Sequence, residues 1–419
     1  MTAPTASTAA ARATAGSSRT LAALGLGGFV VLGLPDGMWG TAWPAMRQTF
    51  DQPLGSLGLI LVFATVGNLM TSLTTGRTLR RFGAGRLLVC AGLIAATGAL
   101  LLAVASVWAM VLAGALLLGA AAGLLDTGLN IVVALSGRLR LLNMLHGAYG
   151  VGSALGPLVV TAAILITSWR PAYVMLIALE LLLTYGWWRS RSHWAAEPDK
   201  VAAPDAADTP AEGTTRRVRV LVGLGVAAFF FYTGLEVTAG QWAASFFRGP
   251  LGLSAGSAGP AVFAYWGSLT AARFAIAIPK RTPRPELLVR VGCAGGLAAA
   301  ALIWWAPSTA AVIVGFAVMG AALAPVFPAL VTLTPVRIGH ARAQHAIGWQ
   351  IAAANVGAAG VSAVTGVILQ HEGLRTLGPC LFVIAVVMIG CNVALEVLSP
   401  RRVTALDSTD NPRGTKVVP

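Results

Sequence analysis

Three carboxylic acids lie deep within apolar stretches of the sequence, where an ionised group is costly. Asp36 lies in GLPDGMWGTAW, Asp126 in GLLDTGLN and Glu236 in GLEVTAGQW. A charged side chain at the centre of a bilayer costs about 2.5–3.5 kcal/mol on insertion scales, so such acids face a cavity or a partner. No lysine or arginine lies at mid-depth in these stretches, which favours proton binding over a buried ion pair. We predict that the three acids couple proton binding to function; the alternative is a neutral acid hydrogen-bonded to a neighbouring helix.

Amide and aromatic side chains recur near these acids. Amides and carboxylates form paired hydrogen bonds with hydroxyl groups, while indole and phenol rings stack on the C–H face of a sugar. The mixture predicts a binding site for a polyhydroxylated solute, formed by Asp36, Trp39, Trp43, Asn130, Glu236, Gln241, Trp242, Tyr265, Trp266, Gln350 and Asn355. Two alternatives stay open, because Trp43 would also serve as an interfacial anchor and buried amides also tie helices together.

The composition is typical of a membrane protein, with 56% hydrophobic and only 11% charged residues. A helix needs about 20 apolar residues to cross a bilayer. Runs of that kind occur at residues 21–46, 55–78, 86–106, 109–135, 143–168, 171–188, 218–247, 256–279, 287–306, 309–334, 343–370 and 375–398. We predict an all-α membrane protein with twelve transmembrane helices in two six-helix bundles.

The net charge of +14 is explained by membrane topology. Most arginines and lysines fall in loops that would share one side of the membrane, and the positive-inside rule makes that side cytoplasmic. We expect a multi-pass protein of the plasma (inner) membrane with both termini in the cytoplasm. No basic stretch is interleaved with exposed aromatics, so no nucleic-acid partner is expected. The four cysteines lie in predicted spans without metal-ligand spacing, so no metal site is expected either.

The two halves of the chain match one another. At an offset of 200 residues, Asp36 aligns with Glu236 and Gly40 with Gly240. Residues 195–215 are acidic and rich in alanine and proline, which is typical of a flexible linker. We predict bundles over 21–188 and 217–399, a cytoplasmic linker over 189–216, and cytoplasmic tails over 1–20 and 400–419.

Six spans, a linker and six further spans in parallel repeat resemble the major facilitator superfamily, whose substrate site lies between the halves at mid-depth. The segment GRTLRRFG (residues 76–83) also resembles the loop motif of that superfamily after the second helix. This resemblance implies a cytoplasmic gate at Gly76, Arg80, Arg81 and Gly83. Arg80 stands where the family has an aspartate, which puts in doubt the charge pairing that latches the gate.

One branch of the superfamily, the fucose-galactose-glucose:proton symporters, is similar in more detail. It carries acids in helices one and four and a glycine-acid pattern in helix seven, where Asp36, Asp126 and Glu236 fall. NMLHGAYG (143–150) and PVFP (325–328) are also similar, which implies that Tyr149 and Phe327 belong to the site. The resemblance implies substrate and proton binding at Asp36 and the main proton carrier at Asp126, although the branch has a glutamate in helix four.

Together these features predict a proton-coupled symporter of a small polar, sugar-like solute that functions as a monomer in the bilayer. The alternative is a proton-coupled exporter of drugs or secondary metabolites, since GSALGP (152–157) resembles a helix-five pattern of drug:proton antiporters. An enzyme is not expected, because no nucleophile with its base is found. No cofactor is expected besides the coupling proton, with sodium not excluded at the Asp126–Asn130 turn. His146 is either a proton relay or a capping or packing residue.

Overall fold

The computed structural model describes residues 6–135, 139–194, 216–277 and 283–399. The predicted tail over 400–419 and most of the predicted linker over 189–216 lie outside these residues. In the described part, eleven helices are long and apolar enough to cross a membrane. The remaining expected span, 256–279, is helix α8, which is not among those eleven. The all-α fold class is therefore confirmed.

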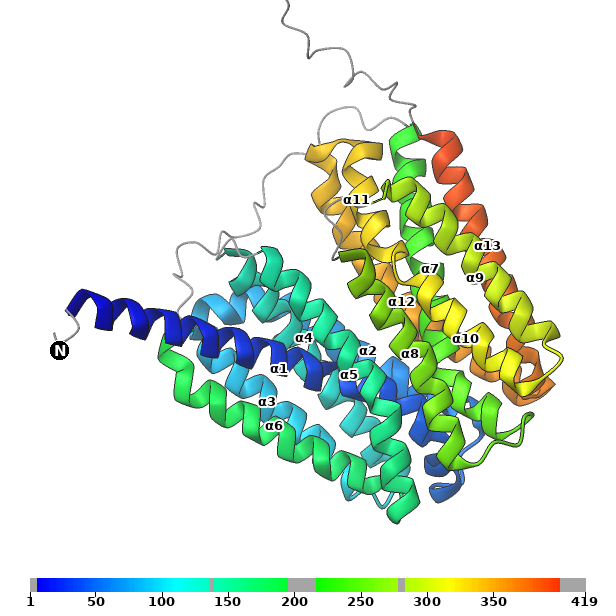
Figure 1. Cartoon of the computed structure of the whole chain (residues 1–419), viewed down its shortest axis with the longest axis horizontal. Helices are drawn as coiled ribbons and strands as arrows, with labels where there is room; N and C mark the ends of the chain where they lie inside the picture. The colour runs from blue at the N-terminus through cyan, green and yellow to red at the C-terminus, as the bar shows by residue number, and fades with distance from the viewer. Residues whose placement is uncertain (1–5, 136–138, 195–215, 278–282, 400–419) are drawn as a thin grey trace, which may run out of the picture.

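The helices follow one another in two consecutive groups, which Figure 1 shows as two bundles side by side. The first group consists of α1 (Ala6–Thr49), α2 (Leu57–Phe82), α3 (Ala84–Ala103), α4 (Trp108–Leu135), α5 (Leu139–Ile166) and α6 (Arg170–Ser190). The second group consists of α7 (Arg216–Arg248), α8 (Ala255–Ala277), α9 (Pro285–Trp305), α10 (Thr309–Leu323), α11 (Val326–Ile338), α12 (His340–Glu372) and α13 (Leu377–Leu398). Short 3₁₀ turns lie at η1 (Leu54–Ser56), η2 (Arg191–His193) and η4 (Leu374–Thr376).

Two helix boundaries differ from the sequence prediction. Helix α1 begins at Ala6, inside the stretch predicted as a tail. The tenth span, predicted as continuous over 309–334, is divided between α10 and α11 at Ala324 and Pro325. Proline lacks an N–H donor and fixes its backbone angle, so an internal proline interrupts helical hydrogen bonding. The Leu323 carbonyl at the end of α10 accepts a hydrogen bond from Tyr232 Oη at 3.1 Å, which joins this interruption to α7.

Small residues set the distance between paired helices within each bundle. A methyl group on Gly33 of α1 would overlap the carbonyl of Tyr149 of α5, and one on Gly152 of α5 would overlap the carbonyl of Val30. In the second bundle, a methyl group on Gly357 of α12 would overlap the carbonyl of Phe230 of α7. Close backbone approach of this kind is the main means of helix association in lipid, where burial of apolar surface gives little advantage. The close packing of α1 on α5 places Tyr149 of α5 next to Asp36 of α1.

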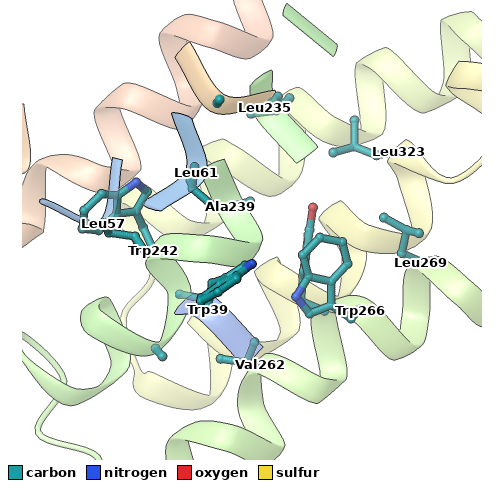
Figure 2. Packing of buried hydrophobic residues seen from close by; sticks show 14 of the residues in the cluster. Trp39, Leu57, Leu61, Leu235, Ala239, Trp242, Val262, Trp266, Leu269 and Leu323 are labelled. Atoms are coloured by element: carbon teal, nitrogen blue, oxygen red, sulfur yellow. The ribbon is translucent and has the colours of Figure 1, made fainter. Parts of the chain in front are cut away.

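The two bundles pack closely at the end where α1 and α7 terminate. There the Gly55 amide donates to Gln370 Oε1 at 3.0 Å, and a methyl group on Gly58 would overlap Ala363 of α12. Trp39 of α1 belongs to the same buried cluster as Trp242 of α7 and Trp266 of α8, and Figure 2 shows these rings around the interface. This end of the interface is therefore closed.

On the side of α2 and α12, the bundles diverge toward the other end, here named the basic end, where α2, α4 and α6 terminate and most arginines lie, whereas Gly147 of α5 still packs on Phe274 of α8. Gly76 is about five turns from Gly58 on one face of α2, and Gly348 is about five turns from Gly366 on one face of α12. Gly366 packs against Trp242, whereas among the described residues a Cβ on Gly348 would meet no atom within 4 Å. A Cβ on Gly76 would meet only Arg80 of its own helix. The separation of the bundles is visible in Figure 1.

Candidate functional site: a central cavity between the bundles

A cavity of about 370 Å³ lies between the two bundles and is lined by residues of both. This volume falls in the range of small-molecule sites. Nine of the predicted site residues line it, namely Asp36, Trp39, Asp126, Tyr149, Glu236, Gln241, Trp266, Phe327 and Asn355. The cavity therefore brings together acids, amides and aromatic rings from chain segments about 200 and 300 residues apart.

Asp36 lies near the middle of the apolar part of α1, Thr20–Thr49, and is held by uncharged groups. Its carboxylate accepts a hydrogen bond from Tyr149 Oη of α5. Its backbone carbonyl accepts one from Gln241 Nε2 of α7 at 2.8 Å, which links the two bundles at this residue. Asp36 also interacts electrostatically with Glu236 across the interface. Among the described residues, no lysine or arginine forms an ion pair with Asp36.

Asp126 lies in α4 and likewise forms no ion pair with a lysine or arginine in the part of the chain that the structure describes. Asn130 Nδ2, one turn further along the helix, donates to Asp126 Oδ1 at 3.0 Å. His146 of α5 lies near enough to interact with Asp126 electrostatically and also lines the cavity. Its ring packs edge-on against Phe29 with 5.8 Å between ring centroids. His146 therefore lines the cavity beside Asp126, and its role as a proton relay stays a prediction.

Glu236 differs from the other two acids, and the prediction that it has no basic partner is wrong. Arg273 Nη2 of α8 lies 3.2 Å from Glu236 Oε1 and 3.3 Å from Glu236 Oε2. Tyr232 Oη donates to Glu236 Oε2, and Tyr265 Oη donates to the Glu236 backbone carbonyl at 2.6 Å. The cation comes from a neighbouring helix, whereas the sequence prediction considered only the helix that carries the acid.

Five predicted binding residues do not line the cavity and are corrected to packing roles. Trp43 donates its indole N–H to the Leu54 carbonyl at 3.0 Å, and Trp242 donates to the Ser362 carbonyl at 3.0 Å. Gln350 accepts a hydrogen bond from Thr334 Oγ1 at 3.0 Å. Asn130 and Tyr265 are engaged with Asp126 and with the Glu236 backbone, as described above. Trp242, Gln350 and Tyr265 join two helices in this way, whereas Trp43 joins α1 to η1 and Asn130 bonds within α4.

The cavity also contains polar residues that the prediction did not assign to the site, namely Asn68, His146, Glu180, Thr233 and Arg273. Glu180 of α6 is only 5% exposed, and its Oε2 has no hydrogen-bond partner among the described residues. Neither Glu180 nor Arg273 aligns with an acid or base in the other half, so the alignment of the two halves did not identify them as site residues. Their depth within an apolar stretch was the one sequence feature that indicated a functional role.

The predicted gate residues lie where α2 ends and α3 begins. Arg80 and Arg81 are in the last turn of α2, and Gly83 adopts a φ of 76°, in the left-handed region that favours glycine. The Arg81 guanidinium lies 5.2 Å from the centroid of the Phe82 ring. Within the described residues, neither arginine forms an ion pair. The gating role of Gly76, Arg80, Arg81 and Gly83 remains a prediction.

Comparisons with known proteins agree with this architecture. The family model of the Major Facilitator Superfamily matches residues 25–362. The solved structure of the nucleoside transporter NupG is similar with a TM-score of 0.72 at 14% identity, over 90% of this chain and 99% of that chain. The human organic anion transporter MFSD10 (TETRAN) has a TM-score of 0.63 at 16% identity, over 90% and 99%. The peptide transporter POT, in complex with sulfate, has a TM-score of 0.69 at 13% identity, over 90% and 94%. None of the curated proteins matches the chain.

Proposed function

The chain belongs to the major facilitator superfamily, and we propose that it is a secondary active transporter that moves a small polar, sugar-like solute together with protons. Family membership makes the protein a membrane transporter and not an enzyme. The observation that carries the coupling proposal is the pair Asp36 and Asp126, which face one central cavity without an ion-paired lysine or arginine among the described residues. The proposed ion is the proton, because uncompensated carboxyl groups in an apolar setting favour the neutral form.

The lining of the cavity supports a solute that is polar on its edge and apolar on its faces. Trp39 and Trp266 supply indole rings from the two bundles, while Gln241 and Asn355 supply amides. Such groups suit a sugar ring, whose hydroxyls form hydrogen bonds while its C–H face stacks on an indole. This arrangement is compatible with the fucose-galactose-glucose:proton symporter branch, which remains part of the proposal.

The shape of the interface supports alternating access, the transport mode in which the bundles rock about a central site. The bundles are closed where α1 and α7 end, through Gly58 and Gln370, and diverge toward the basic end, where Gly348 has open space. The positive-inside rule makes the basic end cytoplasmic. We therefore propose an inward-facing arrangement of the bundles and a location in the inner membrane, which the open space at the basic end supports.

The experiment that tests the coupling uses purified protein in proteoliposomes with an inward proton gradient and a panel of radiolabelled hexoses and sugar acids. We expect wild-type protein to accumulate at least one of these solutes and to acidify the lumen, as followed with an enclosed pH dye. Asp126→Asn should reduce gradient-driven accumulation at least tenfold while leaving solute exchange at equal pH intact. Asp51→Asn is the matched control, because Asp51 is exposed in a loop and its φ of 49° is tolerated by asparagine. Gradient-driven uptake that is unchanged in Asp126→Asn contradicts the proposed coupling role.

A second candidate function is the export of drugs or other apolar compounds. The observation that favours it is the apolar part of the lining, which includes Leu61, Leu118 and Leu269. In that case, cells that overproduce the protein should lose a cationic dye faster than cells with Asp126→Asn, and hexoses should not be accumulated. Equal dye retention in the two strains counts against export.

A further inference from the structure

Arg273 is the one arginine or lysine that lines the central cavity within the described residues. It lies on α8, and its side chain is 27% exposed, compared with 12% for Glu236. Its Nη2 nitrogen makes both hydrogen bonds to Glu236, and its side chain also interacts with Tyr232. A guanidinium carries five N–H donors on a planar fork. Glu236 and Tyr232 together use at most three of these donors, so further donors are left for a ligand at the wall of the cavity.

The surroundings of Arg273 reach across both bundles. Glu236 and Tyr232 of α7 lie on one side, and Arg273 also interacts electrostatically with Tyr149 of α5. Tyr149 in turn donates its hydroxyl to Asp36 of α1. Tyr149 and Asp36 therefore form a hydrogen-bonded pair between α5 and α1 close to Arg273. A ligand of the Arg273 guanidinium lies beside this pair.

Glu236 has a second hydrogen-bond partner besides Arg273, so Arg273 can bind another carboxylate without leaving Glu236 unpartnered. Tyr232 donates a hydrogen bond to Glu236 Oε2, so the carboxylate does not depend on the guanidinium alone. Arginine remains charged under all physiological conditions, and its fork binds a carboxylate through two parallel hydrogen bonds. The Nη2 nitrogen carries two N–H groups, so one can stay with Glu236 while the other, together with Nε or Nη1, holds a second carboxylate.

We propose that Arg273 binds a carboxylate of the transported solute, so that the solute class is a sugar acid and not a neutral sugar. This inference rests on the proposed transport function and narrows its substrate. A monoanionic carboxylate fits better than a phosphate ester, because Glu236 already pairs with the guanidinium, Asp36 lies near enough to interact with Glu236, and both acids oppose a second negative charge. The hydroxyl groups of the solute would then meet Gln241 and Asn355, and its ring would meet Trp39 or Trp266.

The test compares acids with their own amides on full-length protein in lipid nanodiscs. The probes are glucuronate and glucuronamide, galacturonate and galacturonamide, and gluconate and gluconamide, with glucose 6-phosphate as the phosphate arm. Binding is measured by isothermal titration calorimetry. We expect at least one acid to bind about tenfold or more tightly than its amide, the effect of one charge-assisted hydrogen bond. Tighter binding of the phosphate ester than of every acid overturns the carboxylate assignment, as does equal or absent binding within all three pairs.

Arg273→Lys is the decisive variant, because lysine keeps the charge beside Glu236 but lacks the planar fork. We expect it to fold and to reduce the preference for the acid over the amide at least fivefold. Arg290→Lys is the matched control, since Arg290 pairs with Glu396 at the basic end, is 66% exposed and does not line the cavity. An unchanged acid preference in Arg273→Lys overturns the inference.

The two proposals fail in different ways. Proton-driven uptake of a neutral hexose without any preference for an acid leaves the transporter proposal standing and overturns the role of Arg273. Acid-selective binding without proton-driven uptake of any probe supports the role of Arg273 and contradicts the coupling.

Discussion

Asp36 and Glu236 occupy matching positions in the two repeats and have opposite electrostatic surroundings. Asp36 is held by the hydroxyl of Tyr149, whereas Glu236 is held by Tyr232 and by the guanidinium of Arg273. Within the described residues, the first bundle therefore presents acids without an ion-paired lysine or arginine, and the second presents an acid paired with a cation. Both repeats carry a carboxyl group at the matching position, and the neighbouring helix determines whether that carboxyl group has a cationic partner.

The two bundles contribute different charged groups to the cavity. Asp36, Asp126 and Glu180 all belong to the first bundle and line the cavity without an ion pair in the described part of the chain. In the second bundle, Glu236 and Arg273 form an ion pair, and both residues line the cavity. Under the proposed function, the first bundle binds the proton and the second recognises the solute.

The largest effect is expected from the pair of isosteric substitutions Glu236→Gln and Asp36→Asn. Glu236→Gln leaves Arg273 unpaired, and we expect a loss of about 3 kcal/mol in the free energy of unfolding, since both side chains retain some exposure. Asp36→Asn uncovers no cation and should change that free energy by less than about 1 kcal/mol. Reversible unfolding in mixed micelles, followed by tryptophan fluorescence, measures both.

A double-mutant cycle sharpens this comparison. The variant Glu236→Gln/Arg273→Gln removes both charges, so it should recover most of the stability lost in Glu236→Gln. Asp36→Asn combined with Arg273→Gln should show no such recovery. Equal losses in Glu236→Gln and Asp36→Asn would mean that the two repeats are electrostatically alike, contrary to the structure.

The helices of this fold follow closely from the sequence, because bilayer thickness dictates the length of an apolar run. The interruption of the tenth span is an exception, since Pro325 lies inside a run that is apolar throughout. Two of the tryptophans near the acids are also instructive. Trp43 and Trp242 both donate their indole N–H groups to backbone carbonyls, so an aromatic residue close to an acid in the sequence does not by itself indicate a binding site.

The charge pairing within the site does not follow from the sequence. Arg273 reaches Glu236 because α7 and α8 pack together at one depth, and no local pattern in either helix encodes that meeting. Asp36, Asp126 and Glu236 were found because depth in an apolar run is a local property. Which of them carries a partner is a property of helix packing, and this is why the prediction for Glu236 was wrong.

A smaller effect is expected from removing the two tyrosine hydroxyls. Tyr149→Phe takes away the side-chain donor of Asp36, whereas Tyr232→Phe leaves Glu236 with Arg273. We expect Tyr149→Phe to cost about 1–2 kcal/mol in the free energy of unfolding and Tyr232→Phe about 1 kcal/mol or less. The same fluorescence assay separates them. A larger loss in Tyr232→Phe would show that Glu236 depends on the hydroxyl more than on the guanidinium.

The smallest effect is expected at Glu180, which tests whether the acids of the first bundle are held as neutral groups. Glu180 is buried, lines the cavity and forms no ion pair with a described residue. If it carries a proton in the folded protein, glutamine reproduces its shape and its neutrality, so Glu180→Gln should change the free energy of unfolding by less than about 1 kcal/mol. Glu236→Gln serves as the matched control in the second bundle. A loss at Glu180 as large as that at Glu236 would reveal a charged Glu180, and the contrast between the bundles would then rest on Asp36 and Asp126 alone.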